Sequence, residues 1–408
     1  MTSADAQRAI YVDFECLATE PPHPALLGVL VGSGDEQFEP IITDDRLAPA
    51  RVARRTLRVA TASAAAGEVV ARANAENRRI VGWSFFDRDR LIEASPALEA
   101  DINARYVNAL QIARPWRCTL HPNVAMARED RFAPKHTLDK YAALAGYPEA
   151  AKLRNAAPAK WIRHTLRQLQ ATRGRYGRTT SETRRDWHRL LAYNRHDCLA
   201  LRHIVLKASR ELECWRAYER NQFCVDDGAR RVCFMAGSRS SQLDSLLQRH
   251  GADHWAFLTA WNPASIALSR KQNDARQREQ EEHAAAAGYT LLPGEGVGKD
   301  PEWPPEESFL ILGMTPRRAV AMGRRFGQLA IVAGRRGGPA RLVPCGKADL
   351  VTRHVRPRTR LLELDRSYRE RGRALPDSAE SCDVCRILLK ATGPEPRSDR
   401  VPSPPPIG

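Results

Sequence analysis

Long hydrophobic runs are absent from this 408-residue sequence. No stretch approaches the roughly 18 apolar residues that a membrane-spanning helix requires, so we expect no membrane association. The first ten residues, MTSADAQRAI, contain no positively charged region followed by an apolar stretch, which argues against a secretory signal. The nine cysteines have no framework spacing, so reduced thiols and a cytoplasmic location are expected. Nothing in the sequence indicates an oligomeric state.

Two ligand-binding motifs are incomplete. The segment GEGVGK at 294–299 lacks the pattern G-x-x-x-x-G-K-[ST], which excludes a nucleotide phosphate loop. Cys382 and Cys385 form a single C-x-x-C, with Cys345 and His354 upstream. Zinc sites show tighter spacing of four ligands, so we disfavour a zinc site here.

Positive charge, by contrast, is abundant. The formal net charge is +16, and residues 151–220 hold 17 Lys and Arg against 6 Asp and Glu, a net charge of +11. Clustered arginines bind phosphates through bidentate contacts, which suggests a nucleic-acid surface. Solvated helix faces would have the same composition, and charge alone leaves both interpretations open.

The residue pattern predicts an α/β first domain over residues 1–220, with a mixed sheet. Three short strands joined by turns suggest an antiparallel meander, and helices follow with one further strand near residue 80. The strands are expected at 9–17, 25–32 and 36–43, and the helices at 57–77, 98–110, 135–146, 156–173 and 182–220.

Three further segments are expected after residue 220. Residues 221–240 contain turn-forming residues and are predicted to be a linker. Residues 241–345 alternate between strand and helix patterns and are predicted to be a second, smaller α+β domain. Residues 346–408 are basic and Pro-rich, so a partly disordered tail is expected.

Two acids interrupt the first apolar strand, AIYVDFECLA. Asp13 and Glu15 are two residues apart, so on a strand their side chains point to the same face. Two adjacent carboxylates repel each other and are costly to bury unless a cation lies between them. The pair therefore predicts a metal site, which requires further oxygen ligands from elsewhere in the chain.

Two later segments supply candidate partners. In VGWSFFDRD, a strand ending at Gly82 places Asp87 or Asp89 near the edge of the sheet, and we prefer Asp87, with the rings of Phe85 and Phe86 anchoring the turn. In LLAYNRHDCLALRHI, Tyr193 and Asp197 are four residues apart and project from one helix face. Taken alone, each segment is also compatible with a purely structural role.

Together, D-x-E on the first strand, an acid after a middle strand and Y-x-x-x-D on a late helix resemble the DEDD superfamily of 3′–5′ exonucleases. The resemblance covers about residues 8–215 and is to the Tyr-containing branch, on a ribonuclease-H-like fold. YNRHDCLALRHI is similar to the closing helix of the bacterial ribonuclease-H-like predicted exonucleases. The histidine of the other branch would fall at Ala192, and His196 is expected to be a surface residue.

The resemblance implies a role for each residue. Asp13, Glu15 and Asp197 would bind one Mg²⁺ or Mn²⁺, Asp13 would bridge to a second ion held by Asp87, and Tyr193 would orient the attacking water. Trp83 and Ser84 stand where relatives often have Asn, which weakens the match around Asp87. Phosphates of single-stranded DNA or RNA would contact the basic helices, with these candidates: Arg163, Arg167, Arg173, Arg175, Arg178 and Arg189.

Residues 254–343 resemble a small bacterial domain family of unknown function, on the segments TAWNPASIALS, GYTLLPGEG, WPPEESFLILG and RRFGQLAIVAG. Asn262-Pro263 is a turn former and Asn273 could cap a helix, and a structural role is weighed against a small-molecule or nucleotide pocket. The pattern singles out Trp261, Asn262, Asn273, Glu307, Phe326 and Gln328.

Three hypotheses for the function follow from these observations. The leading one is a metal-dependent 3′–5′ exonuclease that hydrolyses single-stranded DNA or RNA by a two-metal mechanism. A nucleic-acid-binding adaptor with a degenerate nuclease fold is the second. In the third, the second domain senses nucleotides and the nuclease is its effector.

Overall fold

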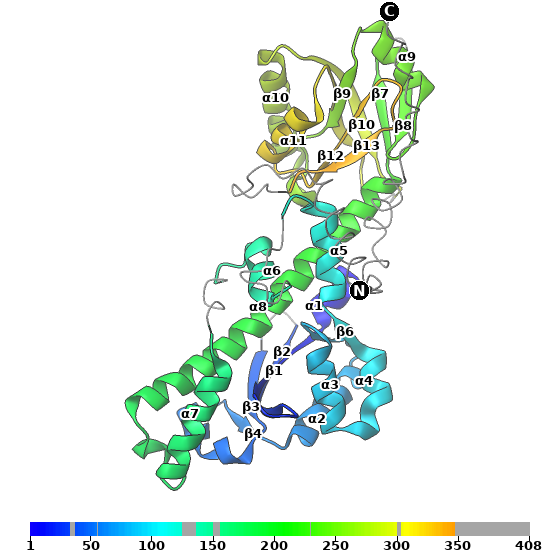
Figure 1. The fold of residues 1–408 in the computed structure, drawn as a ribbon. Helices are drawn as coiled ribbons and strands as arrows, with labels where there is room; N and C mark the ends of the chain where they lie inside the picture. Colours follow the sequence, from blue (N-terminus) through cyan, green and yellow to red (C-terminus); the bar gives the residue numbers. More distant parts are fainter. Residues whose placement is uncertain are drawn as a thin grey trace, which may run out of the picture. The chain divides into compact units, whose positions relative to one another are not determined.

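The structure is a computed structural model that describes residues 1–32, 37–54, 56–124, 136–149, 156–228, 230–299 and 303–346. Two β-sheets with helices confirm the predicted α/β class (Figure 1). Residues 1–347 form one compact unit that contains both sheets. Within the described residues, no helix has the length and apolar character needed to cross a membrane. The predicted tail lies outside the described residues from residue 347 onward.

The first sheet has six strands in the order β4-β3-β2-β1-β5-β6. Strands β1, β2 and β3, which follow one another in the sequence, form the predicted antiparallel meander. Strand β5 is parallel to β1, and β6 is parallel to β5. This arrangement makes β1 a central strand. The strands are β1 (Ile10–Leu17), β2 (His23–Val31), β3 (Gln37–Ile42), β4 (Arg58–Val59), β5 (Ile80–Gly82) and β6 (Tyr106–Asn108).

One face of this sheet packs against α2 (Ala62–Ala75), α3 (Phe85–Ala94) and α4 (Glu99–Arg105). Ile10, Val12 and Phe14 of β1 belong to this core. The prediction of one helix over residues 98–110 was wrong at its C-terminal end. Residues 106–108 pair with β5 as strand β6 and form the edge of the sheet.

The other face of the sheet carries α8 (Ser181–Arg220), a 40-residue helix whose N-terminus is capped by the Thr180 side chain. It contacts β1 and β2, and it also packs against helices α1, α5, α6 and α7 (Figure 1). The predicted helices 135–146, 156–173 and 182–220 are thus confirmed, although their ends shift by a few residues. The bounds are α1 (Ser3–Arg8), α5 (Leu110–Leu120), α6 (Leu138–Ala145) and α7 (Pro158–Ala171).

The second sheet has seven strands, all antiparallel, in the order β13-β12-β9-β11-β10-β7-β8. The antiparallel sheet with separate helices fits the predicted α+β class. Its strands are β7 (Gln222–Asp226), β8 (Arg231–Met235), β9 (His254–Leu258), β10 (Thr290–Val297), β11 (Glu306–Leu312), β12 (Ala330–Arg335) and β13 (Arg341–Pro344). Its helices are α9 (Ser241–Arg249), α10 (Arg270–Ala286) and α11 (Pro316–Arg325).

Two expectations about residues 221–240 require correction. The segment is not a linker, because β7 and β8 form a hairpin that pairs with β10. The turn residues Asp227 and Gly228 connect these strands rather than two domains. Cys224 and Cys233 face each other in the hairpin and form a disulfide, so the expectation of reduced thiols is wrong for this pair.

Short 3-10 helices complete the described structure. Asp44 caps the first of them through its side chain, and Pro263 begins the last, as its turn-forming sequence predicted. They are η1 (Asp45–Ala53), η2 (Pro96–Leu98), η4 (Tyr176–Arg178) and η5 (Pro263–Ser265).

Candidate metal centre

Asp13 and Glu15 lie on the face of β1 that is turned towards α8. Val12 and Phe14 belong to the core on the opposite face. Because side chains alternate along a strand, the two acids share the remaining face, as their spacing predicted. Glu15 is buried, and Asp13 is partly buried.

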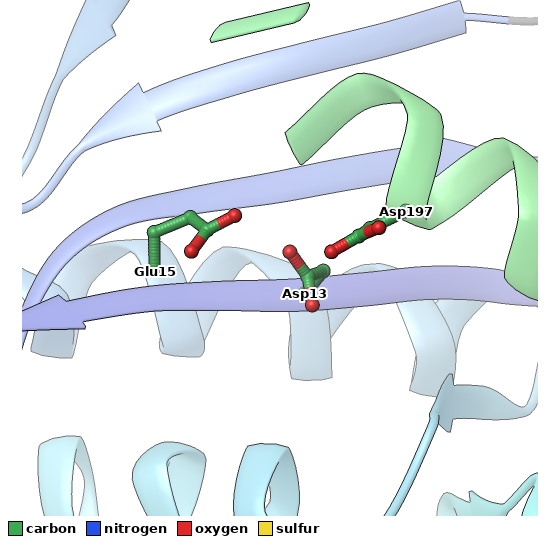
Figure 2. A group of neighbouring side chains, drawn as sticks. All are labelled: Asp13, Glu15 and Asp197. Carbon is green, nitrogen blue, oxygen red and sulfur yellow. The ribbon is translucent and has the colours of Figure 1, made fainter. Parts of the chain in front are cut away.

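Helix α8 brings a third carboxylate to this face. Leu190, Leu191 and Leu201 are buried on one stripe of the helix and fix it against the sheet. Asp197 lies on the same stripe, and one carboxylate oxygen from each of Asp13, Glu15 and Asp197 lies within 4.8 Å of the other two (Figure 2). We refer to these three residues as the carboxylate cluster.

Asp87 lies beside the carboxylate cluster. It occupies the first turn of α3, directly after β5, and its Oδ1 accepts a hydrogen bond from the backbone N–H of Phe14 at 3.2 Å. Gly82 permits this approach, since a Cβ atom there would lie 2.8 Å from Asp87 Oδ2. Asp89 instead forms a 2.7 Å ion pair with Arg88 at the surface. The structure therefore places Asp87, and not Asp89, next to the candidate site.

The rings of Phe85 and Phe86 do not anchor this turn, contrary to prediction. Each residue is 41% exposed. The Ser84 side chain instead caps the helix by accepting a hydrogen bond from the backbone N–H of Phe86. In a helix, consecutive side chains are rotated by about 100°, so when Asp87 points inwards, the two preceding rings are directed away from the core.

Burial raises the pKa of all four acids, and repulsion by neighbouring carboxylates adds to it for Glu15, Asp87 and Asp197. Burial raises the pKa of Asp13 to about 6, although a hydrogen bond from Asn194 lowers it in part. Burial and the charge of Asp13 raise the pKa of Asp87 to about 8. The pKa values of Glu15 and Asp197 lie well above the usual range, from burial first and then from neighbouring carboxylates. A cation at this position would remove the repulsion.

Unpaired oxygens mark the same position. Glu15 Oε1 and Asp197 Oδ1 are buried and have no hydrogen-bond partner. Buried carboxylate oxygens without a partner are costly, because they lose their hydration without compensation. The oxygens are available to a hard cation such as Mg²⁺ or Mn²⁺, for which carboxylates are preferred ligands.

Asn194 is a site residue that the sequence interpretation missed. Its Nδ2 donates to Asp13 Oδ2 at 2.8 Å and to the Asp13 backbone carbonyl at 3.1 Å, which ties α8 to β1. Gly28, opposite Asp13 in the strand pair, leaves room for it, since a Cβ there would lie 2.4 Å from Asn194 Oδ1. A polar residue on the buried stripe of α8 was the available signal. Asp139 of α6 is a further acid whose charge acts on Asp197.

Tyr193 lies one helical turn before Asp197 and hydrogen-bonds to its carboxylate. Its ring also makes an edge contact with Trp161 of α7, with centroids 6.2 Å apart. Burial and the surrounding carboxylates raise the pKa of Tyr193 far above its usual range. The hydroxyl is thus kept protonated and can donate a hydrogen bond beside the cluster.

The six candidate arginines lie on α7, on α8 or on the segment between them. All are exposed, which a phosphate-binding surface requires, and Arg189 makes a 3.3 Å ion pair with Asp186. The residues are Arg163, Arg167, Arg173, Arg175, Arg178 and Arg189. His196, expected at the surface, is instead only 13% exposed and pairs with Glu149 at 2.9 Å.

Three amide side chains beside the second sheet form hydrogen bonds with one another or with the backbone of one loop. Asn273 Nδ2 donates to Asn262 Oδ1, and Asn273 Oδ1 accepts the backbone N–H of Asn262, both at 3.0 Å. Asn262 also donates to Glu306 at 2.7 Å, and Gln328 donates to the Trp261 carbonyl at 2.7 Å. We call Asn262, Asn273 and Gln328 the amide cluster.

The amide cluster holds a loop in an unusual conformation. Asn262, Ala264 and Ser265 all have positive φ angles, which non-glycine residues rarely adopt. Asn273 does not cap α10, because Ser269 does so. Phe326 is buried in the core, and Glu307 pairs with Arg270 at the surface.

The zinc candidates Cys382, Cys385 and His354 lie outside the described residues, and Cys345 is buried.

The comparisons with known proteins concern this second sheet. Residues 258–331 match a family model described as "Protein of unknown function (DUF3293)", which agrees with the resemblance noted over residues 254–343. The match covers less than half of the chain, so it assigns that segment alone, and no nuclease family is among the matches. No curated protein and no solved structure matches the chain.

Proposed function

We propose that the first sheet and its helices form a metal-dependent nuclease that hydrolyses single-stranded DNA or RNA from the 3′ end. The observation that carries the proposal is the carboxylate cluster, in which one oxygen of each residue lies within 4.8 Å of the others although its members are up to 184 positions apart in sequence. A buried cluster of this kind is stable only with bound protons or a bound cation.

The residues present suit two divalent ions. Asp13, Glu15 and Asp197 would hold the first, and Asp13 with Asp87 would hold the second. The unpaired oxygens of Glu15 and Asp197 and the all-carboxylate donor set favour Mg²⁺ or Mn²⁺. When bound, such ions lower the pKa of a water molecule and stabilise the leaving oxygen of a phosphodiester.

Other residues of the chain position the reactants in this proposal. The protonated Tyr193 hydroxyl, which donates to Asp197, would orient the attacking water by accepting a hydrogen bond from it. Asn194 fixes Asp13 from two sides, through its carboxylate and its backbone carbonyl. Catalytic geometry depends on such supporting contacts, because small displacements of a ligand reduce the rate strongly.

The sheet and the surface charge also support the proposal. A meander followed by parallel strands, with the acids on the central strand β1, is consistent with the expected ribonuclease-H-like fold. The six exposed arginines of the α7–α8 region would bind the phosphates of the strand. The arginine–phosphate contacts are therefore part of the proposed function.

The test is degradation of a labelled single-stranded oligonucleotide by the full-length protein with Mn²⁺. We expect successive shortening from the 3′ end, with the 5′-labelled product retained until the last steps, and no cleavage of a circular single strand. Asp13→Asn should abolish the activity, whereas Asp89→Asn, at the exposed acid on α3, should leave it unchanged. Oligonucleotide binding without shortening under any divalent ion would favour the adaptor hypothesis instead.

A further inference from the structure

Phe85 and Phe86 are two adjacent aromatic residues at the surface of the first domain. Within the described part of the chain, five large apolar residues are prominently exposed, and these two are the aromatic ones among them. The others, Val52, Met235 and Ile266, lie apart from them in the sequence. Exposure of two neighbouring rings is costly in water, so a role outside the folded core is indicated.

The two rings lie at the edge of the candidate metal centre. Phe86 directly precedes Asp87, whose carboxylate accepts the backbone N–H of Phe14, and Phe14 stands between the two acids of β1. The guanidinium of Arg90, located 5.2 Å from the centre of the Phe86 ring, donates to the carbonyl of Pro22 in the β1–β2 loop. The rings are thus held near the end of β1 where Glu15 lies.

A guanidinium group lies close to each ring, and each is ion-paired with a carboxylate of the same helix, Arg88 with Asp89 and Arg90 with Glu93. Arg88 lies 4.4 Å from the centre of the Phe85 ring, so each ring carries one guanidinium close to it. Single-stranded nucleic acids are bound by exposed aromatic rings that stack on their bases, and the guanidinium groups packed against these two rings hold the rings in place. A purely apolar partner surface would bury the Arg88–Asp89 and Arg90–Glu93 ion pairs beside the rings without compensation, which is costly.

We propose that Phe85 and Phe86 form a base-stacking platform that holds the terminal nucleotides of a single strand next to the carboxylates. The inference rests on the proposed nuclease function and adds its specificity for unpaired bases, since a base within a duplex has no free face to stack. Stacking does not depend on the identity of the base, so little sequence preference is expected.

The test compares an ordinary oligonucleotide with one whose two 3′-terminal nucleotides are abasic. Binding is measured by fluorescence anisotropy with Asp13→Asn protein in Mn²⁺, so that it does not depend on cleavage. The ordinary oligonucleotide should bind about tenfold or more tightly than the abasic one. Adding Phe85→Ala and Phe86→Ala should remove this difference, whereas Phe85→Tyr with Phe86→Tyr should retain it, as should the matched control Val52→Ala, another exposed apolar residue.

Several results would overturn the platform while leaving the nuclease proposal intact. One such result is that the wild type cleaves the oligonucleotide while the Asp13→Asn protein binds the ordinary and the abasic oligonucleotides with the same affinity. Another is an equal loss of both affinities in the double alanine variant, which would indicate phosphate contacts. A change in self-association on size-exclusion chromatography without any change in oligonucleotide affinity would make the rings a protein interface. Conversely, base-dependent binding without cleavage by the wild type would retain the platform and contradict the nuclease.

Discussion

The two sheets each contain a group of polar residues, but the groups differ in how their atoms are paired. In the carboxylate cluster, like charges meet in a buried position, and Glu15 Oε1 and Asp197 Oδ1 have no hydrogen-bond partner. In the amide cluster, Asn262 and Asn273 bind each other at 3.0 Å in two hydrogen bonds. The first arrangement needs a ligand to be stable, whereas the second stabilises its own loop. The difference indicates which group is a site and which is part of the framework.

The largest effect is expected where the carboxylate cluster is altered. Asp197→Asn removes a metal ligand, and the cleavage rate should fall by about 10³-fold or more, because metal stabilisation is worth several kcal/mol. The same variant removes one carboxylate from a group of mutually repelling acids, so its thermal midpoint without metal at pH 8 should rise above that of the wild type. Oligonucleotide cleavage and thermal unfolding of the two proteins check both parts. A lower midpoint would contradict the ligand role.

The pH dependence of stability distinguishes the clusters in a second way. An unfolded Asp loses its proton near pH 4, whereas Asp13 and Asp87 keep theirs up to about pH 6 and 8. The folded protein therefore binds more protons between these values, and its metal-free stability should fall as the pH rises from about 4 to 8.

Mn²⁺ should offset that loss, so its effect on the thermal midpoint should be larger at pH 8 than at pH 5. Thermal unfolding over this range, with and without Mn²⁺, is the measurement. Asp13→Asn serves as the control and should flatten both dependences. An equal Mn²⁺ effect at both pH values would argue against binding at these carboxylates.

In the amide cluster the expected effect is on stability alone. Asn273→Ala leaves the backbone N–H and the side-chain Oδ1 of Asn262 short of a partner and should lower the free energy of unfolding by about 1–3 kcal/mol. Urea denaturation checks this, with Asn103→Ala at an exposed position of α4 as the control. Cleavage should be retained. Loss of activity without loss of stability would instead assign this cluster a functional role.

A smaller effect is expected at Gly28. A methyl group there would lie 2.4 Å from Asn194 Oδ1, so Gly28→Ala should displace Asn194 and, with it, Asp13. Supporting contacts of this kind change metal affinity or activity by about 10-fold or more. The matched control is Gly177→Ala, where a Cβ meets no atom within 4 Å. Equal rates for the two variants would show that Asn194 does not position Asp13.

The carboxylate cluster was predictable because its signals are local. Acids two residues apart on a strand share a face, and Tyr193 and Asp197 are one helical turn apart. Asn194 and Gly28 were not predicted, because their contact depends on how closely α8 approaches β1 and β2. The apolar character of Phe85 and Phe86 led to the prediction that their rings anchor the turn. The orientation of Asp87 in the same turn instead directs them outwards.

Fold errors had a similar origin. Residues 221–240 are rich in turn formers, but β7 pairs with β10, about 70 residues away, and β8 pairs with β7. Residues 106–108 continue a helical pattern but pair with β5. In both cases tertiary pairing overrides the local preference. Long periodic segments such as α8 were predicted well, since a 40-residue amphipathic pattern has little competition.

The most direct test of the central claim is Mn²⁺ binding by the full-length protein, measured by isothermal titration calorimetry at pH 8. The account predicts two ions per chain in the wild type, binding that is severely weakened in Asp13→Asn and Asp197→Asn, and unchanged binding in Asp89→Asn. Binding of the same strength in all four proteins, or none in any of them, would contradict the assignment of Asp13, Glu15 and Asp197 as a metal centre.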